Sequence, residues 1–86
     1  MNKNKLTARA LDELRGLILA AYSDARFEVF KGYDPDGTYL RAIVNADDIN
    51  DVMDVFIKRL IEFQDEDDLD VYVVVSRPQV GTAKAS

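Results

Sequence analysis

The chain has 86 residues and a formal net charge of −5, and it contains neither cysteine nor histidine. One domain is expected at this length, because a single hydrophobic core supports roughly 50–200 residues. Without cysteine there is no disulfide or thiolate nucleophile, and without histidine the chain lacks the commonest general base and metal ligand. These absences predict a protein that is not an enzyme and that holds no cofactor or metal.

The charge is unevenly distributed along the chain. Residues 47–70 carry ten acidic and two basic side chains, a balance of −8, whereas the remainder has a balance of +3. An acidic balance makes nucleic-acid binding unfavourable, since neutralisation of phosphates by Lys and Arg supplies that affinity. The longest apolar run, Leu17–Tyr22, is far shorter than the roughly 20 residues of a membrane span, and no signal peptide is recognisable. We therefore expect a cytoplasmic protein without membrane contact.

The first predicted element is an amphipathic helix. Residues 1–5 are expected to be frayed, Thr7 is the predicted N-cap, and the apolar stripe continues to about Tyr22. Gly16 interrupts this helix at a cost of about 1 kcal/mol relative to alanine. We interpret that glycine as a point where a neighbouring backbone approaches closely.

A β-hairpin follows the helix. Arg26–Tyr33 and Thr38–Asn45 are rich in β-branched and aromatic residues, and Asp34–Gly37 between them suits a type I turn. Pairing of Tyr33 with Thr38 collects the apolar side chains on one face of the hairpin.

A slip by one residue from this register sets Lys31 opposite Arg41, which is unfavourable. We therefore predict the first register, although a bulge at Gly37 could enforce the second.

The best-patterned stretch of the chain is the helix predicted over Asp47–Phe63. Asp47 or Asp48 is expected as its N-cap. Its apolar side chains recur at helical spacing on one face, at positions 49, 52, 53, 56, 57, 60 and 61. Phe56 and Leu60 are expected to lie in the core.

The third strand is predicted over Leu69–Ser76 and is followed by a disordered tail at 78–86, which leaves one domain over residues 6–77. A right-handed crossover makes this strand parallel to the second strand. The predicted fold is an α+β two-layer sandwich of order α-β-β-α-β, in which a three-stranded mixed or antiparallel sheet has both helices on one face. This topology resembles a ferredoxin-like βαββαβ fold without its first strand.

Three acidic patterns are candidate sites of chemistry. Asp34–Thr38 lacks the ligand spacing of an EF-hand and is better explained as a turn. The run Asp65–Asp68 with Asp70 would need a rigid loop to hold a divalent cation. The carboxylates of Glu28, Asp51, Asp54 and Glu62 suggest paired acids for hydrolysis, but nothing in the sequence brings two of them together.

The same acids suggest a docking surface for a basic protein partner, as in an inhibitor or antitoxin-like subunit. The residues assigned to this acidic docking surface are Asp51, Asp54, Asp65, Glu66, Asp67 and Asp68.

Two helices cover only one face of a three-stranded sheet, so the other face is expected to be an interface. The predicted interface residues are Phe30, Tyr39, Arg41, Ile43, Tyr72 and Val74. Our leading hypothesis is a non-catalytic interaction domain that forms a homodimer through this open face or a sheet edge. Single-stranded RNA binding by the aromatic and arginine side chains is a weaker alternative, because the chain lacks the RNP1 pattern.

Overall fold

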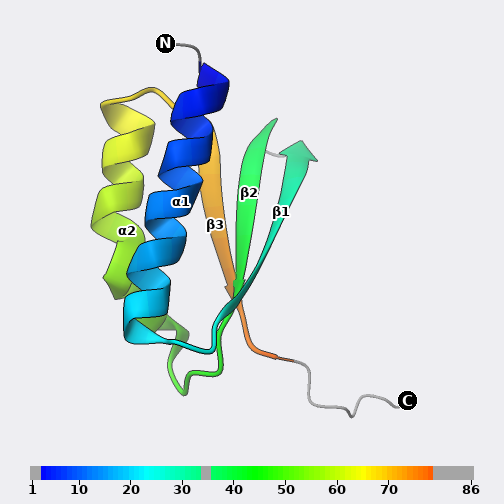
Figure 1. The fold of residues 1–86 in the computed structure, drawn as a ribbon, viewed down its shortest axis with the longest axis vertical. Helices are drawn as coiled ribbons and strands as arrows, with labels where there is room; N and C mark the ends of the chain where they lie inside the picture. Colours follow the sequence, from blue (N-terminus) through cyan, green and yellow to red (C-terminus); the bar gives the residue numbers. More distant parts are fainter. Residues whose placement is uncertain (1–2, 34–35, 79–86) are drawn as a thin grey trace.

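The computed structural model describes residues 3–33 and 36–78, which fold in the order α-β-β-α-β (Figure 1). The elements are α1 (Lys3–Ala21), β1 (Arg26–Tyr33), β2 (Asp36–Ile43), α2 (Ile49–Asp65) and β3 (Val71–Ser76). The sheet order is β1-β2-β3, with β1 antiparallel and β3 parallel to β2. The predicted α+β class, the mixed sheet and the parallel crossover are confirmed. The tail predicted at 78–86 lies, beyond Pro78, outside the described residues.

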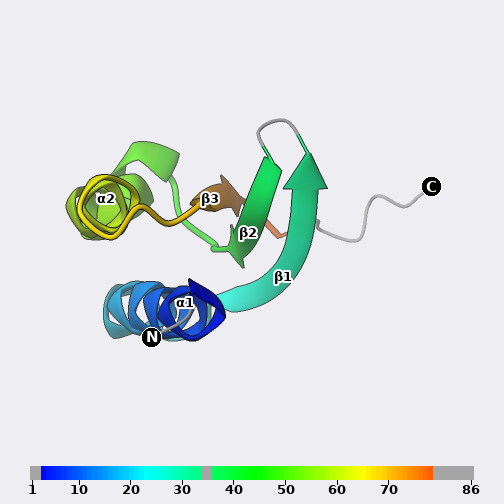
Figure 2. The same ribbon diagram turned by 90° about the horizontal axis from the view of Figure 1, so that it is seen from above.

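Both helices lie to one side of the strands, so the structure has a helical layer and a sheet layer (Figure 2). The two layers enclose one hydrophobic core. Its buried members are Ala10, Leu11, Leu14, Ile18, Leu40, Ala42, Val44, Val52, Phe56, Leu60, Phe63, Leu69 and Val71. None of them belongs to β1, which lies on the side of the sheet farthest from the helices (Figure 1).

Helix α2 begins as predicted. Asp48 is its N-cap, and the side-chain carboxylate accepts a hydrogen bond of 2.9 Å from the backbone N–H of Asn50. Such a cap satisfies one of the N–H groups that have no partner inside the helix. The helix continues two residues beyond the predicted end at Phe63, to Asp65.

The apolar stripe of α2 is rotated slightly from the prediction. Val52, Phe56 and Leu60 are buried as expected, but Met53 is 38% and Ile61 47% exposed. Phe63 is buried in their place. The rotation arises because α2 packs against α1 as well as against β3, which selects the side of the stripe nearest to α1.

Helix α1 differs from the prediction at its start. It begins at Lys3, so Thr7 lies inside the helix and is not its N-cap, and residues 3–5 are helical rather than frayed. Leu6 packs against the core, and this contact supports the additional turn. The prediction for Gly16 is also wrong, because a Cβ atom at this position would have no neighbour within 4 Å.

The hairpin register is shifted by two residues from the prediction. Tyr33 pairs with Asp36 rather than with Thr38, so Asp36 and Gly37 belong to β2 and not to a four-residue turn. Residues 34 and 35 lie outside the described residues. A shift of two preserves the alternation of side chains, so the predicted division of the two faces is correct.

Candidate interaction surface

The register of the sheet arranges the face opposite the helices into rows of three residues. Phe30, Tyr39 and Tyr72 pair directly across β1, β2 and β3 and form one row. The next row contains Glu28, Arg41 and Val74. Because side chains alternate between the two faces of a strand, all residues of these rows point away from the helical layer.

Neighbouring rings of the first row are in contact with each other. The ring centroids of Phe30 and Tyr39 are 5.3 Å apart at an interplanar angle of 19°, and those of Tyr39 and Tyr72 are 5.1 Å apart at 34°. These separations lie within the range of favourable aromatic pairs. We call this set of three side chains the aromatic row.

Arg41 connects the aromatic row to the second row. Its Cζ atom lies 5.3 Å from the ring centroid of Phe30, in the range of a cation–π contact. Its Nη1 atom is 3.7 Å from Oε1 of Glu28, and both side chains are partly exposed. The open face therefore carries one positive and one negative group beside its apolar centre.

Gly32 and Gly37, which pair across β1 and β2, make room for the aromatic row. A Cβ atom on Gly32 would overlap the ring of Tyr39. On Gly37 it would lie 2.6 Å from the carbonyl oxygen of Asp70 and 2.7 Å from Cε2 of Tyr72. Neither glycine has a positive φ, so the close approach of neighbouring atoms, and not the backbone conformation, explains why both positions are glycine. The rings cover the glycine backbone, an arrangement known as aromatic rescue.

The six residues predicted as an interface therefore lie on one face, as expected from strand alternation. Phe30 and Val74 are 37% and 40% exposed, and Tyr39, Ile43 and Tyr72 are partly buried. The sequence reasoning did not identify the row arrangement or the two glycines. The signal for the glycines was their position beside aromatic residues in the predicted strands.

Strand β1 has a second exposed side that the sequence reasoning also missed. Val29 and Tyr33 point toward the helical side of the sheet, yet they are 50% and 84% exposed. Neither α1 nor α2 covers this part of β1, because the hairpin turns away from the helical layer toward its tip (Figure 1). The signal available in the sequence was that two helices are too few to cover three strands.

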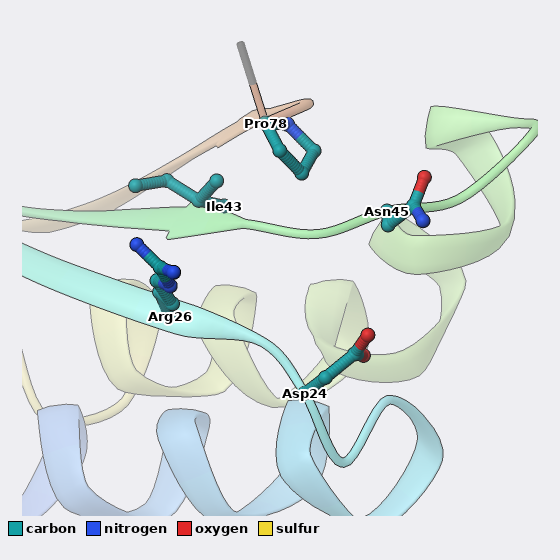
Figure 3. A pocket seen from close by; sticks show the side chains of 5 residues that line it. All are labelled: Asp24, Arg26, Ile43, Asn45 and Pro78. Carbon is teal, nitrogen blue, oxygen red and sulfur yellow. The ribbon is translucent and has the colours of Figure 1, made fainter. Parts of the chain in front are cut away.

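An open pocket of about 530 Å³ lies where the sheet ends, near the start of β1 (Figure 3). Arg26 and Ile43 line it from neighbouring strands, and Asp24, Asn45 and Pro78 line it from adjoining segments. Figure 3 shows the charged ends of Asp24 and Arg26 pointing in different directions. The lining includes the charged side chains of Asp24 and Arg26 and the amide of Asn45, so the pocket adds a polar end to the open face.

The acidic residues proposed for hydrolysis are dispersed. Glu28 lies on the open face beside Arg41, whereas Glu62 on α2 is 2.9 Å from Nη1 of Arg59. Asp51 and Asp54 are exposed elsewhere on α2. Among the described residues, no group of three acidic side chains is arranged to hold a metal ion.

The acidic run at the end of α2 surrounds the connection to β3. Asp65, Glu66, Asp67 and Asp68 are all exposed, and Asp68 adopts the left-handed backbone conformation with φ of 55°. The backbone N–H of Leu69 then bonds to the carbonyl of Phe63, which returns the chain to the core. The acidic docking surface thus lies on the helical side of the molecule.

Arg59 joins the two helices across the helical layer. Its guanidinium donates two hydrogen bonds to the carboxylate of Glu13, one of them 3.2 Å long, and its Cζ atom lies 4.2 Å from the ring centroid of Phe63. The hydrogen bond from Arg59 holds the pKa of Glu13 below its usual range. Hydrogen bonds to Glu13 and Glu62 raise the pKa of Arg59.

Comparisons of the chain with models of protein families, with curated protein sequences and with solved structures give no match. Within the described residues, no helix has both the length and the apolar character needed to cross a membrane. The class that the fold and the surface define is thus a two-layer α+β domain with a helix-free sheet face.

Proposed function

We propose that this protein is a non-catalytic interaction domain that self-associates as a homodimer through the exposed part of its sheet. The observation that carries this proposal is the aromatic row, which lies on the face without helices beside the exposed side chain of Val74. Contiguous apolar surface of this kind is typical of protein interfaces. The cytoplasmic location expected from the sequence is part of the same proposal.

The geometry of the rings favours a protein partner over single-stranded RNA. Base stacking needs an accessible ring face. The ring of Tyr39 contacts Phe30 on one side and Tyr72 on the other, so its faces are already occupied. Packing of apolar side chains from a second protein molecule requires only the exposed edges of the row.

Sedimentation velocity between about 10 and 500 µM tests the proposal, since this range brackets micromolar dissociation constants. We expect a concentration-dependent dimer for the native chain and a monomer for Phe30→Glu. Met53→Glu is the matched control, because Met53 has a similar exposure, 38%, but lies on α2. A native chain that remains monomeric over the whole range would overturn the proposal.

A second candidate function is the docking of a basic protein on the acidic docking surface. The observation that favours it is the exposure of all four acids from Asp65 to Asp68 at one connection. Binding should weaken steeply with salt, because exposed charges are screened beyond about 8–10 Å at physiological ionic strength. Pull-down with the native chain and with Asp65, Glu66 and Asp67 all changed to Lys tests this idea. Partners without a basic surface, or equal capture by both chains, would contradict it.

A further inference from the structure

The two edges of the sheet are not equivalent. At β3 the outer edge is partly closed, because the side-chain amide of Gln64 on α2 donates a 2.8 Å hydrogen bond to the carbonyl of Val71. At β1 the described residues place no helix or strand along the outer edge (Figure 1). This strand also carries three exposed large hydrophobic side chains, Val29, Phe30 and Tyr33. Exposed strand edges of this kind pair readily with another chain.

The backbone hydrogen bonds determine which groups of β1 point outward. The N–H group of Thr38 in β2 bonds to the carbonyl of Asp70, and the N–H group of Val44, directly after β2, bonds to the carbonyl of Ser76. Alternate residues of β2 therefore face β3. The residues between them face β1 and bond there. Through the register, the N–H and C=O groups of β1 that point away from the sheet belong to Phe27, Val29, Lys31 and Tyr33.

We infer that β1 pairs with β1 of a second copy in antiparallel orientation, with Phe30 on the two-fold axis. This inference rests on the proposed self-association and specifies its geometry. Phe27 of one copy then lies opposite Tyr33 of the other, and Val29 lies opposite Lys31. All four outward-facing residues of each strand become paired, which gives about eight new backbone hydrogen bonds, because each bonded pair exchanges two.

This pairing explains the position of the aromatic row. The two Phe30 residues form a non-hydrogen-bonded pair, in which the Cα atoms are about 4.5 Å apart. The two aromatic rows therefore join into a single row of six rings across a continuous six-stranded sheet. The pairing also covers Tyr33, which is 84% exposed in one copy. Moving the register by two residues toward the hairpin tip would set Lys31 opposite Lys31, which like-charge repulsion disfavours.

A disulfide test locates the axis. The chain has no cysteine, so a single introduced thiol can only link two copies. Phe30→Cys should form a covalent dimer under mild oxidation, because a Cα separation of about 4.5 Å lies within the 4.4–6.8 Å range of disulfides. Val74→Cys is the control, since Val74 has a similar exposure on the open face but lies on the opposite edge strand.

A charge-exchange test fixes the register. Val29→Lys places a lysine opposite Lys31 of the other copy at two symmetric positions, and we expect dimerisation to weaken at least about tenfold. Adding Lys31→Glu to Val29→Lys converts both repulsive pairs into attractive ones and should restore the dimer. Val29 lies on the helical side of the sheet, so a dimer formed through the open face would not respond to either change.

The outcomes separate this inference from the proposed function. Covalent dimers of Phe30→Cys but not of Val74→Cys, with loss and recovery in the charge-exchange pair, support β1 pairing. A native dimer that Val29→Lys leaves intact and that Val74→Cys cross-links overturns β1 pairing but retains self-association. A native chain that is monomeric at every concentration overturns both β1 pairing and self-association. A strand of another protein would then be the expected partner of the β1 edge.

Discussion

Two glycines determine how the open face can be built. Gly37 lies in the middle of the sheet, where its backbone is close to Asp70 and to the ring of Tyr72. Gly32 on β1 leaves space for the ring of Tyr39, which a Cβ atom at that position would overlap. A glycine in a strand has no side chain to pack and weakens the strand unless another group covers it. The aromatic row provides that cover, so the glycines and the rings act as a unit.

We expect Gly37→Ala to destabilise the domain by about 1–3 kcal/mol, the usual cost of overpacking. The obstructing carbonyl of Asp70 cannot move without loosening its 2.9 Å hydrogen bond from the N–H of Thr38. Urea unfolding monitored by circular dichroism measures the change. Gly16→Ala is the control, because its Cβ meets nothing within 4 Å and alanine favours a helix by about 1 kcal/mol. Equal midpoints for the two variants would contradict this role of Gly37.

The ion pair between Glu13 and Arg59 predicts a dependence of stability on pH. Since the pKa of Glu13 is lowered in the folded chain, the pair stabilises the fold above the carboxylate's ordinary pKa of 4.5. That contribution is lost as the pH falls through the lowered value. We therefore expect Glu13→Gln to reduce the urea midpoint at pH 7 and to match the native chain once the pH has fallen below the lowered pKa of Glu13. A difference that persists at acidic pH would show that another contact is responsible. Partial exposure of both side chains keeps the expected effect small.

At the scale of elements, α2 organises the core through one line of buried side chains. Phe56 is 1% exposed, whereas Ile61, one of the residues assigned to the same stripe from sequence, is 47% exposed. The two residues therefore allow a core position and a surface position of the same helix to be compared, each with a large apolar side chain.

Phe56→Ala should cost about 3–5 kcal/mol, because it removes a buried ring and leaves a cavity between the two layers. Ile61→Ala should change the free energy of unfolding by no more than about 0.5 kcal/mol. Chemical denaturation of both variants checks the pair. A large loss for Ile61→Ala would mean that its exposed face is covered by another molecule, which dilution of the sample would reveal.

The elements show why sequence reasoning succeeded for some features and failed for others. The start of α2 and its aspartate cap, predicted as Asp47 or Asp48, follow from local patterns, namely apolar spacing and the chemistry of the first turn. Its end at Asp65 lies two residues beyond the prediction. The hairpin register does not follow from a local pattern, because a shift of two residues leaves the division of side chains between the two faces unchanged. The positions of the six residues predicted as an interface depend only on that pattern, and their common face was therefore predictable.

The finer structure of the site required tertiary information. The aromatic row depends on the true pairing of Phe30, Tyr39 and Tyr72, and the role of Gly37 depends on the approach of Asp70. The exposure of Val29 depends on where the helices lie over the sheet. None of these can be read from local spacing, since each is set by contacts between distant segments.

At the scale of the whole molecule, charge and exposed apolar surface are separated. Residues 47–70 carry a balance of −8, and their acids lie just before α2, on α2 and on its connection to β3. The outer edge of β1 lies on the side of the sheet away from α2 (Figure 2). Two copies that meet at β1 therefore keep their acidic regions apart, but each still has a net charge of −5.

This distribution predicts how self-association responds to salt. Between like-charged molecules, repulsion is screened as the Debye length falls from about 10 Å at 0.1 M toward 3 Å at 1 M. The dimer should therefore tighten severalfold between low and high salt, whereas docking of a basic partner would weaken. Sedimentation velocity at several salt concentrations measures the difference. The combined changes Glu66→Gln and Asp67→Asn remove two exposed charges far from β1 and should flatten the response. If the dimer instead dissociates as the salt concentration rises, attractive charged pairs hold the interface together. The interface would then lie at the acidic docking surface and not at β1.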